Sequence, residues 1–258
     1  MAQSETFGAR IAAASQRLAA ACGRLYRRLW FRKDGTKPWV RRVALTLFAF
    51  LVPIPILLIL LFRFVPIPFT PQMVIDLVTL NPVRYHWVDY LPPTLGRAVI
   101  GSEDQRFCRH HGFDWESIDK AIKAHERGRR LRGASTLSQQ TARTIFLTPT
   151  RSWIRKGIEA YLTVLLEGLW PKERILKAYL NLVDWGHGNF GADAASTYYF
   201  GKPAAELSPS EASRLAAILP NPSGWSAAKP GPYVRRRTKA ITGKIHQVSR
   251  DGLDWCVR

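Results

Sequence analysis

The chain has 258 residues, of which 47% are hydrophobic, so it can form one sizeable folded domain with appendages and is not a disordered chain. Its 38 lysines and arginines against 19 acidic residues give a formal net charge of +19. A surplus of this size indicates an anionic partner, which is nucleic acid, an anionic membrane surface or a phosphate-bearing substrate. Charge alone does not choose among the three.

Residues 1–42 form a basic tail that holds ten lysines and arginines against two acids. Apolar side chains from Ile11 to Leu29 recur on one face of a helix whose other face is rich in arginine. Such a helix either lies on the anionic inner leaflet of a membrane or is solvated. The composition also resembles a mitochondrial transit peptide, an interpretation that the apolar segment directly afterwards does not favour.

Residues 43–65 are predicted to cross a membrane. A run of twenty residues without a charge begins at Val43, and as a helix it is ~30 Å long, which matches the bilayer core. Pro53 and Pro55 interrupt it, and a spanning helix tolerates proline better than a buried soluble helix, the alternative interpretation. By the positive-inside rule the tail is cytoplasmic and the rest of the chain is exported. No small-residue cleavage site follows, so a cleaved signal peptide is not expected.

The remainder is predicted to be a stalk over residues 66–93 and an all-α domain over residues 94–258. The stalk is rich in proline and aromatic residues and shows no sustained period. The domain is helical in pattern almost throughout, and no alternating strand pattern of any length appears in it. Helices are expected after the cap Asp114, after the capping box Thr136–Gln139, over 151–170, from Pro171, and over 208–219.

Two glutamates lie in polar, cationic clusters. Glu103 is followed by Phe107, which can shield the carboxyl from water and raise its pKa. Glu159 follows Arg155 and Lys156 by one helical turn. Taken alone this second cluster is explained by surface ion pairs worth ~0.3–0.5 kcal/mol. Together, one desolvated carboxylate and one bound to cations are suited to glycosyl transfer.

A strip of cations from Arg127 to Arg132 precedes the helix that begins after Thr136. Free N–H groups at a helix N-terminus, arginines and neutral donors together favour a phosphate. A solvated loop before an ordinary capped helix explains the same residues equally well.

Three short motifs carry no function here. The G-x-G-x-x-G pattern at 186–191 follows a helical stripe instead of a strand and is predicted to be a loop. The S-x-x-K pattern at 117–120 has no accompanying K-T-G. Neither H-E-x-x-H nor C-x-x-C occurs, so no protein-built metal site is expected. Cys108 and Cys256 would be exported, and one pair makes no disulfide framework, so their redox state stays open.

Four blocks of sequence, taken in order, closely resemble the monofunctional biosynthetic peptidoglycan glycosyltransferases of glycosyltransferase family 51. The blocks lie at 102–114, 133–140, 155–159 and 174–181, and the resemblance covers about residues 70–245. It implies a lysozyme-like helical fold with a small membrane-proximal lobe. It also implies polymerisation of lipid II into β-1,4-linked glycan strands, with inversion at the donor anomeric carbon and release of undecaprenyl pyrophosphate.

The same resemblance implies roles for individual residues. Glu103 becomes the general base for the acceptor 4-hydroxyl, and Glu159 the acid that orients the donor and assists the leaving group. Arg143 stands where the family commonly has lysine, which keeps the charge but alters the contact geometry. Substrate binding is expected from Ser135, Thr136, Gln140, Arg143, Arg155, Lys156 and Arg132, and shaping of the site from Asp104, Phe107, His110 and Asn181.

No cofactor is required by the sequence, although the resemblance implies that a divalent cation, Mg²⁺ or Mn²⁺, can help at the pyrophosphate. The expected partners are lipid II, the growing lipid-linked chain, membrane lipids and the cell-wall synthesis machinery, and not nucleic acid. The expected location is the bacterial inner membrane, with a single pass, a cytoplasmic N-terminus and a periplasmic catalytic domain.

Two other functions remain open. A lysozyme-like lytic enzyme also uses an essential glutamate, but cleavage of glycan has no use for clusters that bind phosphate. A non-enzymatic anchored protein that binds nucleic acid would need aromatic residues among its cations, and the strip 127–132 contains none. Polymerisation of a lipid-linked disaccharide is therefore the favoured function.

Overall fold

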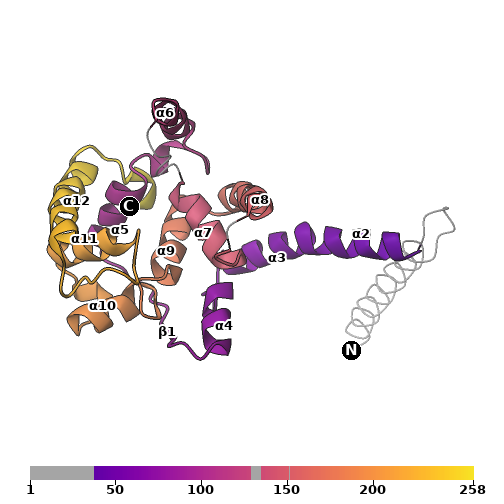
Figure 1. Cartoon of the computed structure of the whole chain (residues 1–258), viewed down its shortest axis with the longest axis horizontal. Coiled ribbons are helices and arrows are strands. Elements are labelled where there is room, and N and C mark those ends of the chain that lie inside the picture. The colour runs from indigo at the N-terminus through magenta and orange to yellow at the C-terminus, as the bar shows by residue number, and fades with distance from the viewer. Residues whose placement is uncertain (1–37, 129–134, 151) are drawn as a thin grey trace, which may run out of the picture. The chain divides into compact units, whose positions relative to one another are not determined.

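The computed structural model describes residues 38–128, 135–150 and 152–258. The prediction of a basic tail therefore falls mostly outside the described residues. The chain divides into two units between Leu57 and Leu58, and the second unit holds the helical domain (Figure 1). Its helices are α4 (Pro71–Val78), α5 (Pro93–Glu103), α6 (Trp115–Glu126), α7 (Leu137–Phe146), α8 (Trp153–Leu169), α9 (Lys172–Leu182), α10 (Ala192–Phe200), α11 (Pro209–Ile218) and α12 (Pro232–Arg250), with the short turns η1 (Phe107–Arg109), η2 (Ala204–Glu206) and η3 (Trp255–Val257).

The apolar segment consists of α2 (Pro38–Leu51) and α3 (Pro53–Phe62). Hydrogen bonds continue through the proline-containing junction, because the Ile56 N–H donates to the Val52 carbonyl at 3.3 Å. From Trp39 to Phe62 the segment is 24 residues long with a mean hydropathy of 2.8, and in the described part of the chain it is the one helix long and apolar enough to cross a membrane. A helix suited to spanning therefore lies where the sequence predicts one, and it ends at Phe62, before residue 65.

The last turn of α3 belongs to the second unit and is bound by α8 and α9. The Trp170 indole donates to the Ile59 carbonyl at 2.6 Å, and Arg174 donates to the Phe62 carbonyl at 2.9 and 2.6 Å. The Arg174 guanidinium also lies over the Trp170 ring, 5.3 Å from its centroid. The Phe62 carbonyl is one that a helix end leaves free, and the Ile59 carbonyl accepts from Trp170 in addition to the Arg63 N–H. The end of the apolar segment is therefore attached to the domain.

Residues 66–93, expected to be a stalk, fold as part of the second unit. The Thr70 side chain caps α4 by accepting from the Met73 N–H, and Ile67 and Met73 are buried in the main core. β1 (Arg84–Tyr85) pairs in parallel with β2 (Asn189–Phe190). Sequence patterns missed this because one short helix and strands of two residues are too brief to show a period.

The glycines of the G-x-G-x-x-G pattern serve backbone packing next to β2. Gly186 has a φ of 92°, and a Cβ there would lie 2.0 Å from the Pro222 carbonyl oxygen. Gly188 has a φ of 75°, and a Cβ there would lie 1.8 Å from the Pro82 carbonyl oxygen. Only glycine fits such approaches, so the pattern reflects chain packing and not dinucleotide binding.

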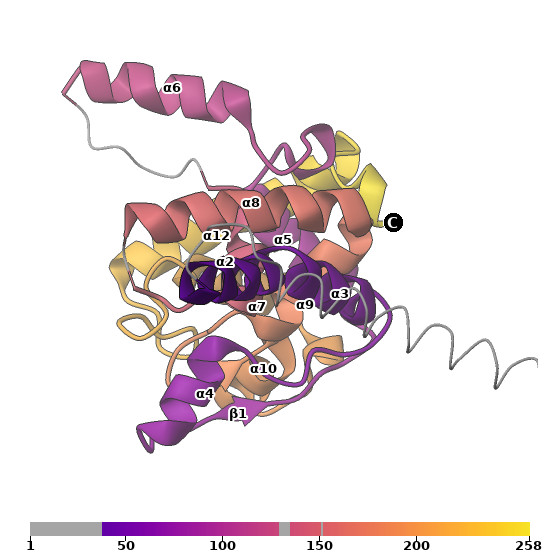
Figure 2. The ribbon, with the colours of Figure 1, turned by 90° about the vertical axis from the view of Figure 1, so that its right-hand side faces the viewer.

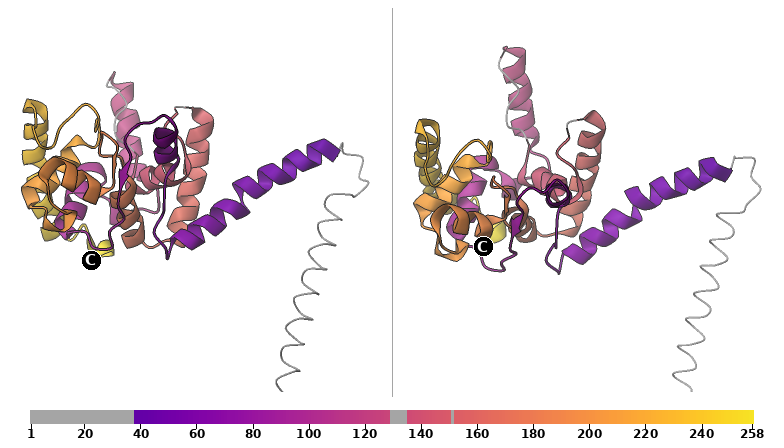
Figure 3. Two further views of the ribbon diagram at one scale, coloured as in Figure 1. Left: turned by 90° about the horizontal axis from the view of Figure 1, so that it is seen from below. Right: turned by 60° about the horizontal axis from the view of Figure 1, so that its bottom comes forward.

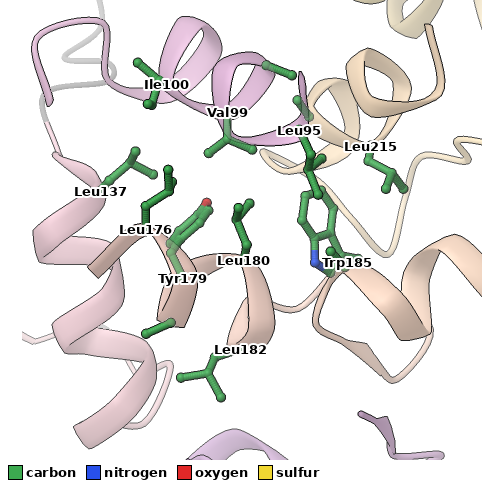
Figure 4. Close-up of a cluster of buried hydrophobic side chains, with 14 of the residues drawn as sticks. Leu95, Val99, Ile100, Leu137, Leu176, Tyr179, Leu180, Leu182, Trp185 and Leu215 are labelled. Atoms are coloured by element: carbon green, nitrogen blue, oxygen red, sulfur yellow. The ribbon is translucent and has the colours of Figure 1, made fainter. Parts of the chain in front are cut away.

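The core lies between α5, α9 and α11. Figure 4 shows Leu95, Val99 and Ile100 of α5 facing Leu176, Tyr179 and Leu180 of α9, with Leu215 of α11 nearby. α5 also packs against α12, and α7 against α8 and α9. The view in Figure 3 shows α12 and α8 on opposite sides of the domain. Glu103 ends α5, so this packing fixes the position of its backbone.

The predicted helix starts are confirmed, with small differences at the ends. Asp114 caps α6, and the capping boxes at Thr136 and Ser208 each make both of their reciprocal bonds. Pro171 precedes α9 as its cap instead of beginning it. α6 stands out from the body in Figure 2, and none of its residues is buried against the described part of the chain.

A disulfide joins Cys108 in η1 to Cys256 in η3, across 148 residues of sequence. η1 follows Glu103 by a few residues, so the bond ties the segment after the catalytic candidate to the C-terminal turn. Next to it, Asp254 accepts from Arg97 of α5 at 2.8 Å. The C-terminal turn is thus attached covalently to η1 and by an ion pair to α5.

Candidate active site

A polar pocket of about 280 Å³ lies at the C-terminal end of α5. Four segments of the chain meet there, at residues 101–106, 114–120, 135–136 and 244. The lining residues are Gly101, Ser102, Glu103, Asp104, Gln105, Arg106, Asp114, Ser117, Lys120, Ser135, Thr136 and Lys244.

Glu103 is the carboxylate of this pocket, and its side chain is 17% exposed. Oε1 accepts from Arg237 Nη2 at 3.1 Å, and Oε2 accepts from Gln140 Nε2 at 3.4 Å. Burial raises the pKa of the Glu103 carboxyl, and the nearby cations Arg237 and Lys244 only partly offset this. The carboxylate is therefore reachable from the pocket and biased toward holding a proton.

Gln140 is fixed by a hydroxyl from the core. The Tyr179 OH donates to Gln140 Oε1 at 3.1 Å, so the Gln140 amide nitrogen is free to face Glu103. Burial raises the pKa of Tyr179 well above its ordinary value, with the Glu103 charge acting in the same direction. Tyr179 remains a neutral donor, and Figure 4 shows its hydroxyl directed toward α5.

Asp104 and His110 hold the segment after Glu103 against α7. His110 Nε2 lies 3.0 Å from Asp104 Oδ2, which also accepts from the Leu137 N–H at 2.9 Å. The Thr136 hydroxyl donates to the Gly112 carbonyl at 2.6 Å. The Asp104 and His110 side chains are both buried. Their contacts join two walls of the pocket, as a role in shaping the site would require.

Phe107 is fully buried at the start of η1. Lys172 Nζ lies 4.5 Å from the Phe107 ring centroid and also donates to Glu167 at 2.6 Å. Ser138 of α7 donates to the same Glu167 oxygen. Phe107 thus anchors η1 to the junction of α7, α8 and α9, and the pKa of Glu103 is raised by burial in general.

Glu159 lies within α8, and its side chain is only 1% exposed. Arg155 Nη1 donates to Oε2 at 2.8 Å, and Lys156 donates to Oε1. The interpretation as a surface ion pair is therefore wrong, because the pair is buried at its carboxylate end. Glu159 does not line the pocket of Glu103; it holds two cations, of which Lys156 remains 41% exposed.

The other predicted site residues divide into two groups. Ser135 and Thr136 line the pocket, and Arg143 lies near enough to Tyr179 to influence its pKa. Asn181 does not line it: its side chain bonds the backbone of Val88 at 2.9 and 3.1 Å. Arg132 lies outside the described residues.

Two cations of the site were missed by sequence reasoning. Arg237 and Lys244 of α12 reach the Glu103 carboxylate from more than 130 residues away in sequence. They lie seven residues apart and share a helix face. The signal that was present is the composition of α12, which contains four arginines, two lysines and one histidine among 19 residues and no acid.

The arrangement provides a desolvated carboxylate for proton transfer, with fixed donors beside it and a separate pair of cations bound to a second carboxylate. Among the described residues no three histidines, cysteines or acids are grouped so that they could hold a metal ion. The chemistry offered by this chain's own groups is therefore general base catalysis and electrostatic stabilisation of anions.

Comparison with known proteins gives the family. The transglycosylase family profile matches residues 76–246. A biosynthetic peptidoglycan transglycosylase of Caulobacter vibrioides is 47% identical over 220 residues, which is 84% of this chain and 96% of that protein. One from Rhodospirillum centenum is 49% identical over 221 residues, covering 84% and 95%. One from Pseudomonas aeruginosa is 54% identical over 163 residues, covering 63% and 70%. With a family match over most of its length and close relatives at 47–54% identity, this chain belongs to the transglycosylase family.

Proposed function

We propose that the protein polymerises lipid II into β-1,4-linked glycan strands, with Glu103 as the general base. The observation that carries this proposal is the environment of Glu103: a partly exposed carboxylate whose pKa is raised by burial and whose two oxygens face Gln140 and Arg237. A base with a raised pKa lies closer to the working pH, where general base catalysis is most effective.

In the proposed step the acceptor 4-hydroxyl lies in the pocket and gives its proton to Glu103. The hydroxyl oxygen attacks the donor anomeric carbon, the bond to the pyrophosphate oxygen breaks, and undecaprenyl pyrophosphate leaves with the bonding electrons. One displacement inverts the anomeric carbon. Gln140 and Arg237 hold the carboxylate in place, because each binds one of its oxygens.

The departing pyrophosphate requires cations that do not rearrange during the reaction. Arg155 and Lys156 are held by Glu159, and we assign to them, with Arg143, the binding of the donor pyrophosphate. In this proposal Glu159 orients the donor through its two cations, since it lies outside the pocket of Glu103. Ser135 contributes a neutral donor at the N-terminus of α7, where anions are favoured. The Thr136 hydroxyl and N–H already donate to Gly112 and Gln139, so Thr136 holds that end of the helix in place.

A divalent cation is given no step in this mechanism, because the described residues offer no cluster that would hold one. Any Mg²⁺ or Mn²⁺ that helps at the pyrophosphate would be bound chiefly by the substrate's own oxygens. This chain's contribution to the charge of the leaving group is the set of arginines and lysines.

The proposed orientation has a cytoplasmic N-terminus and an exported catalytic domain. The basic tail before the apolar helix supports it by the positive-inside rule. The Cys108–Cys256 disulfide supports it independently, because disulfides persist in oxidising compartments such as the periplasm. A tag at the C-terminus should be accessible to an impermeant reagent from the periplasmic side, and accessibility only from the cytoplasm would contradict the orientation.

The experiment that tests the function is incubation of the detergent-solubilised full chain with labelled lipid II, followed by lysozyme digestion of the product. We expect a polymer that lysozyme cuts to disaccharide units. If the protein leaves lipid II unchanged but releases fragments from purified sacculi, it is a lytic enzyme and the proposal is wrong.

A further inference from the structure

A second cationic hollow lies between α11 and α12, outside the site described above. It has a volume of about 550 Å³. We call it the α11–α12 groove, and it is lined by Ser210, Arg214, Pro230, Arg235, Thr238, Lys239, Thr242, Gly243 and His246.

The groove presents cations and hydroxyls, and none of the described residues that line it is acidic. The Lys239 and His246 side chains have no ion pair or hydrogen bond with a described residue. Arg235 uses one nitrogen on the Pro230 carbonyl at 2.7 Å, which leaves its other N–H groups available. The Thr238 hydroxyl is buried without a partner among the described residues. Buried hydroxyls are normally bonded, so the wall of the groove has hydrogen-bonding capacity left over for a ligand.

The groove and the catalytic pocket use opposite flanks of one helix. Arg237 and Lys244 point toward Glu103, whereas Lys239 is two residues, or about 200°, around the helix from Arg237. The two flanks are therefore separated by roughly one helix diameter, ~10 Å. A polymer that leaves the pocket around α12 would reach the groove within a short length of chain.

The place of the groove favours a ligand from the aqueous side over a membrane lipid. The end of the apolar helix is bound by Trp170 and Arg174 at the junction of α8 and α9. Figures 1 and 3 show α12 on the opposite side of the second unit from α8. Within the second unit, the groove thus lies on the side away from the point where the end of α3 meets α8 and α9. The anions that the proposed reaction itself brings to the aqueous side are the carboxylates of the peptides carried by each disaccharide.

We propose that the α11–α12 groove binds peptide carboxylates of the glycan strand outside the catalytic pocket, through the cations Arg235 and Lys239. The proposal rests on the proposed function, because that reaction supplies the strand. Binding here would retain the strand by contacts that need not change during bond formation. The groove is thus a holding site for the product and takes no part in the chemistry.

The test measures binding of fluorescent, uncrosslinked glycan strands to the full chain in detergent, with peptides attached or removed by an amidase. We expect removal of the peptides to weaken binding about fivefold, and Arg235→Gln/Lys239→Gln to weaken binding of peptide-bearing strands by a similar factor. The variant should bind bare strands as the parent does. Lys229→Gln/Arg236→Gln removes the same charge from exposed positions outside the groove and should change binding less than about twofold.

Three results would overturn the proposal: equal binding of bare and peptide-bearing strands, an equal loss in the control variant, or retained binding in the groove variant. Inorganic phosphate that displaces the strands while acetate at the same ionic strength does not would assign the groove to phosphate instead. Tighter binding of poly-glutamate than of peptide-bearing strands would assign it to an acidic protein. Both outcomes contradict the proposal.

Failure of this proposal can be told apart from failure of the proposed function, because strand binding requires no turnover. The groove variant should consume lipid II at the parent's initial rate and release shorter strands. If the parent itself does not consume lipid II, the proposed function is wrong, whatever the binding assay shows. If the parent polymerises and the groove variant gives strands of unchanged length and affinity, only the groove proposal is lost.

Discussion

Glu103 and Glu159 show two ways of placing a carboxylate beside cations. Glu159 is buried and takes both of its partners from one turn of its own helix, at positions three and four residues before it. Glu103 is partly exposed and takes its partners from α7 and α12, 37 and 134 residues away. The arrangement at Glu159 holds two cations in place, and it is determined by residues close together in sequence. The arrangement at Glu103 tunes a base, and it depends on how the whole domain packs.

The largest effect should come from Glu103→Gln, which removes the base and keeps the shape. Loss of a general base typically lowers the rate by about 10²–10⁴-fold, so polymer formation from labelled lipid II should fall into that range. Glu126→Gln, on the exposed surface of α6, is the matched control and should remain active. Retained polymerisation in Glu103→Gln would contradict the assignment of the base.

The same variant tests the physical cause of the raised pKa. Because the folded pKa of Glu103 lies above the ordinary value, the folded state binds a proton more tightly than the unfolded state does. Its contribution to stability is full below the unfolded pKa and is lost as pH rises through the folded pKa. The free energy of unfolding of the parent, relative to Glu103→Gln, should therefore fall as pH rises through that window. An opposite slope in urea titrations would show that the cations, and not burial, dominate.

Glu159→Gln should lower both the stability of the domain and the rate of polymerisation. Removing one partner of a buried ion pair commonly costs about 3–5 kcal/mol, and Arg155, 16% exposed, would lose its partner. We expect a lower midpoint of chemical unfolding together with slower polymerisation. Asp119→Asn breaks an exposed pair with Lys123 and should change stability by less than about 1 kcal/mol. Full activity would leave Glu159 with a structural role only.

Removal of the disulfide by Cys108→Ser/Cys256→Ser should affect the Glu103 region more than the Glu159 region. The bond closes 148 residues, and loss of a disulfide typically costs 2–4 kcal/mol, with about 5 as the upper value for a loop of this length. Hydrogen exchange should become faster in η1 and η3 and stay unchanged in the middle of α8. Uniform acceleration across the domain would show that the bond stabilises the fold without favouring either region.

The smallest effect should be a shift in pH dependence from Arg237→Gln. The Arg237 cation lowers the pKa of Glu103 against the larger effect of burial, so its removal should raise that pKa further. The base must be ionised to act, so the acidic limb of the kcat/KM profile should move to higher pH. Arg237→Lys should restore part of the shift. An unchanged limb with a lower rate at every pH would mean that Arg237 acts on the substrate instead.

Sequence predicts well those features of this molecule that depend on contacts within one or two helical turns. Asp114, Thr136 and Ser208 make caps with neighbours three residues away, so their helices could be placed without a structure. The apolar span was recognisable from its length alone. The grouping of Arg155, Lys156 and Glu159 was visible too, but its burial was not, because burial depends on what packs over a helix.

The parts that sequence missed depend on contacts between distant segments. Arg237 meets Glu103 only because α12 packs on α5. β1 and β2 are two residues each and pair although they lie 105 residues apart in sequence (Arg84 with Asn189). The pairing of Cys108 with Cys256 likewise needed the C-terminal turn to lie beside η1. Asn181 was predicted to shape the site because of its motif, whereas its side chain bonds the backbone of Val88.

The bond between Cys108 and Cys256 has a consequence for how the enzyme matures. With the proposed orientation, the first cysteine emerges from the export channel well before its partner, and the 148 intervening residues must follow before the two can be oxidised together. The disulfide can therefore form only when translocation of the domain is nearly finished. Protein made in a reducing cytosol would lack the disulfide. A preparation from that source should contain a fraction in which both thiols are free and η1, the segment after Glu103, is less firmly held.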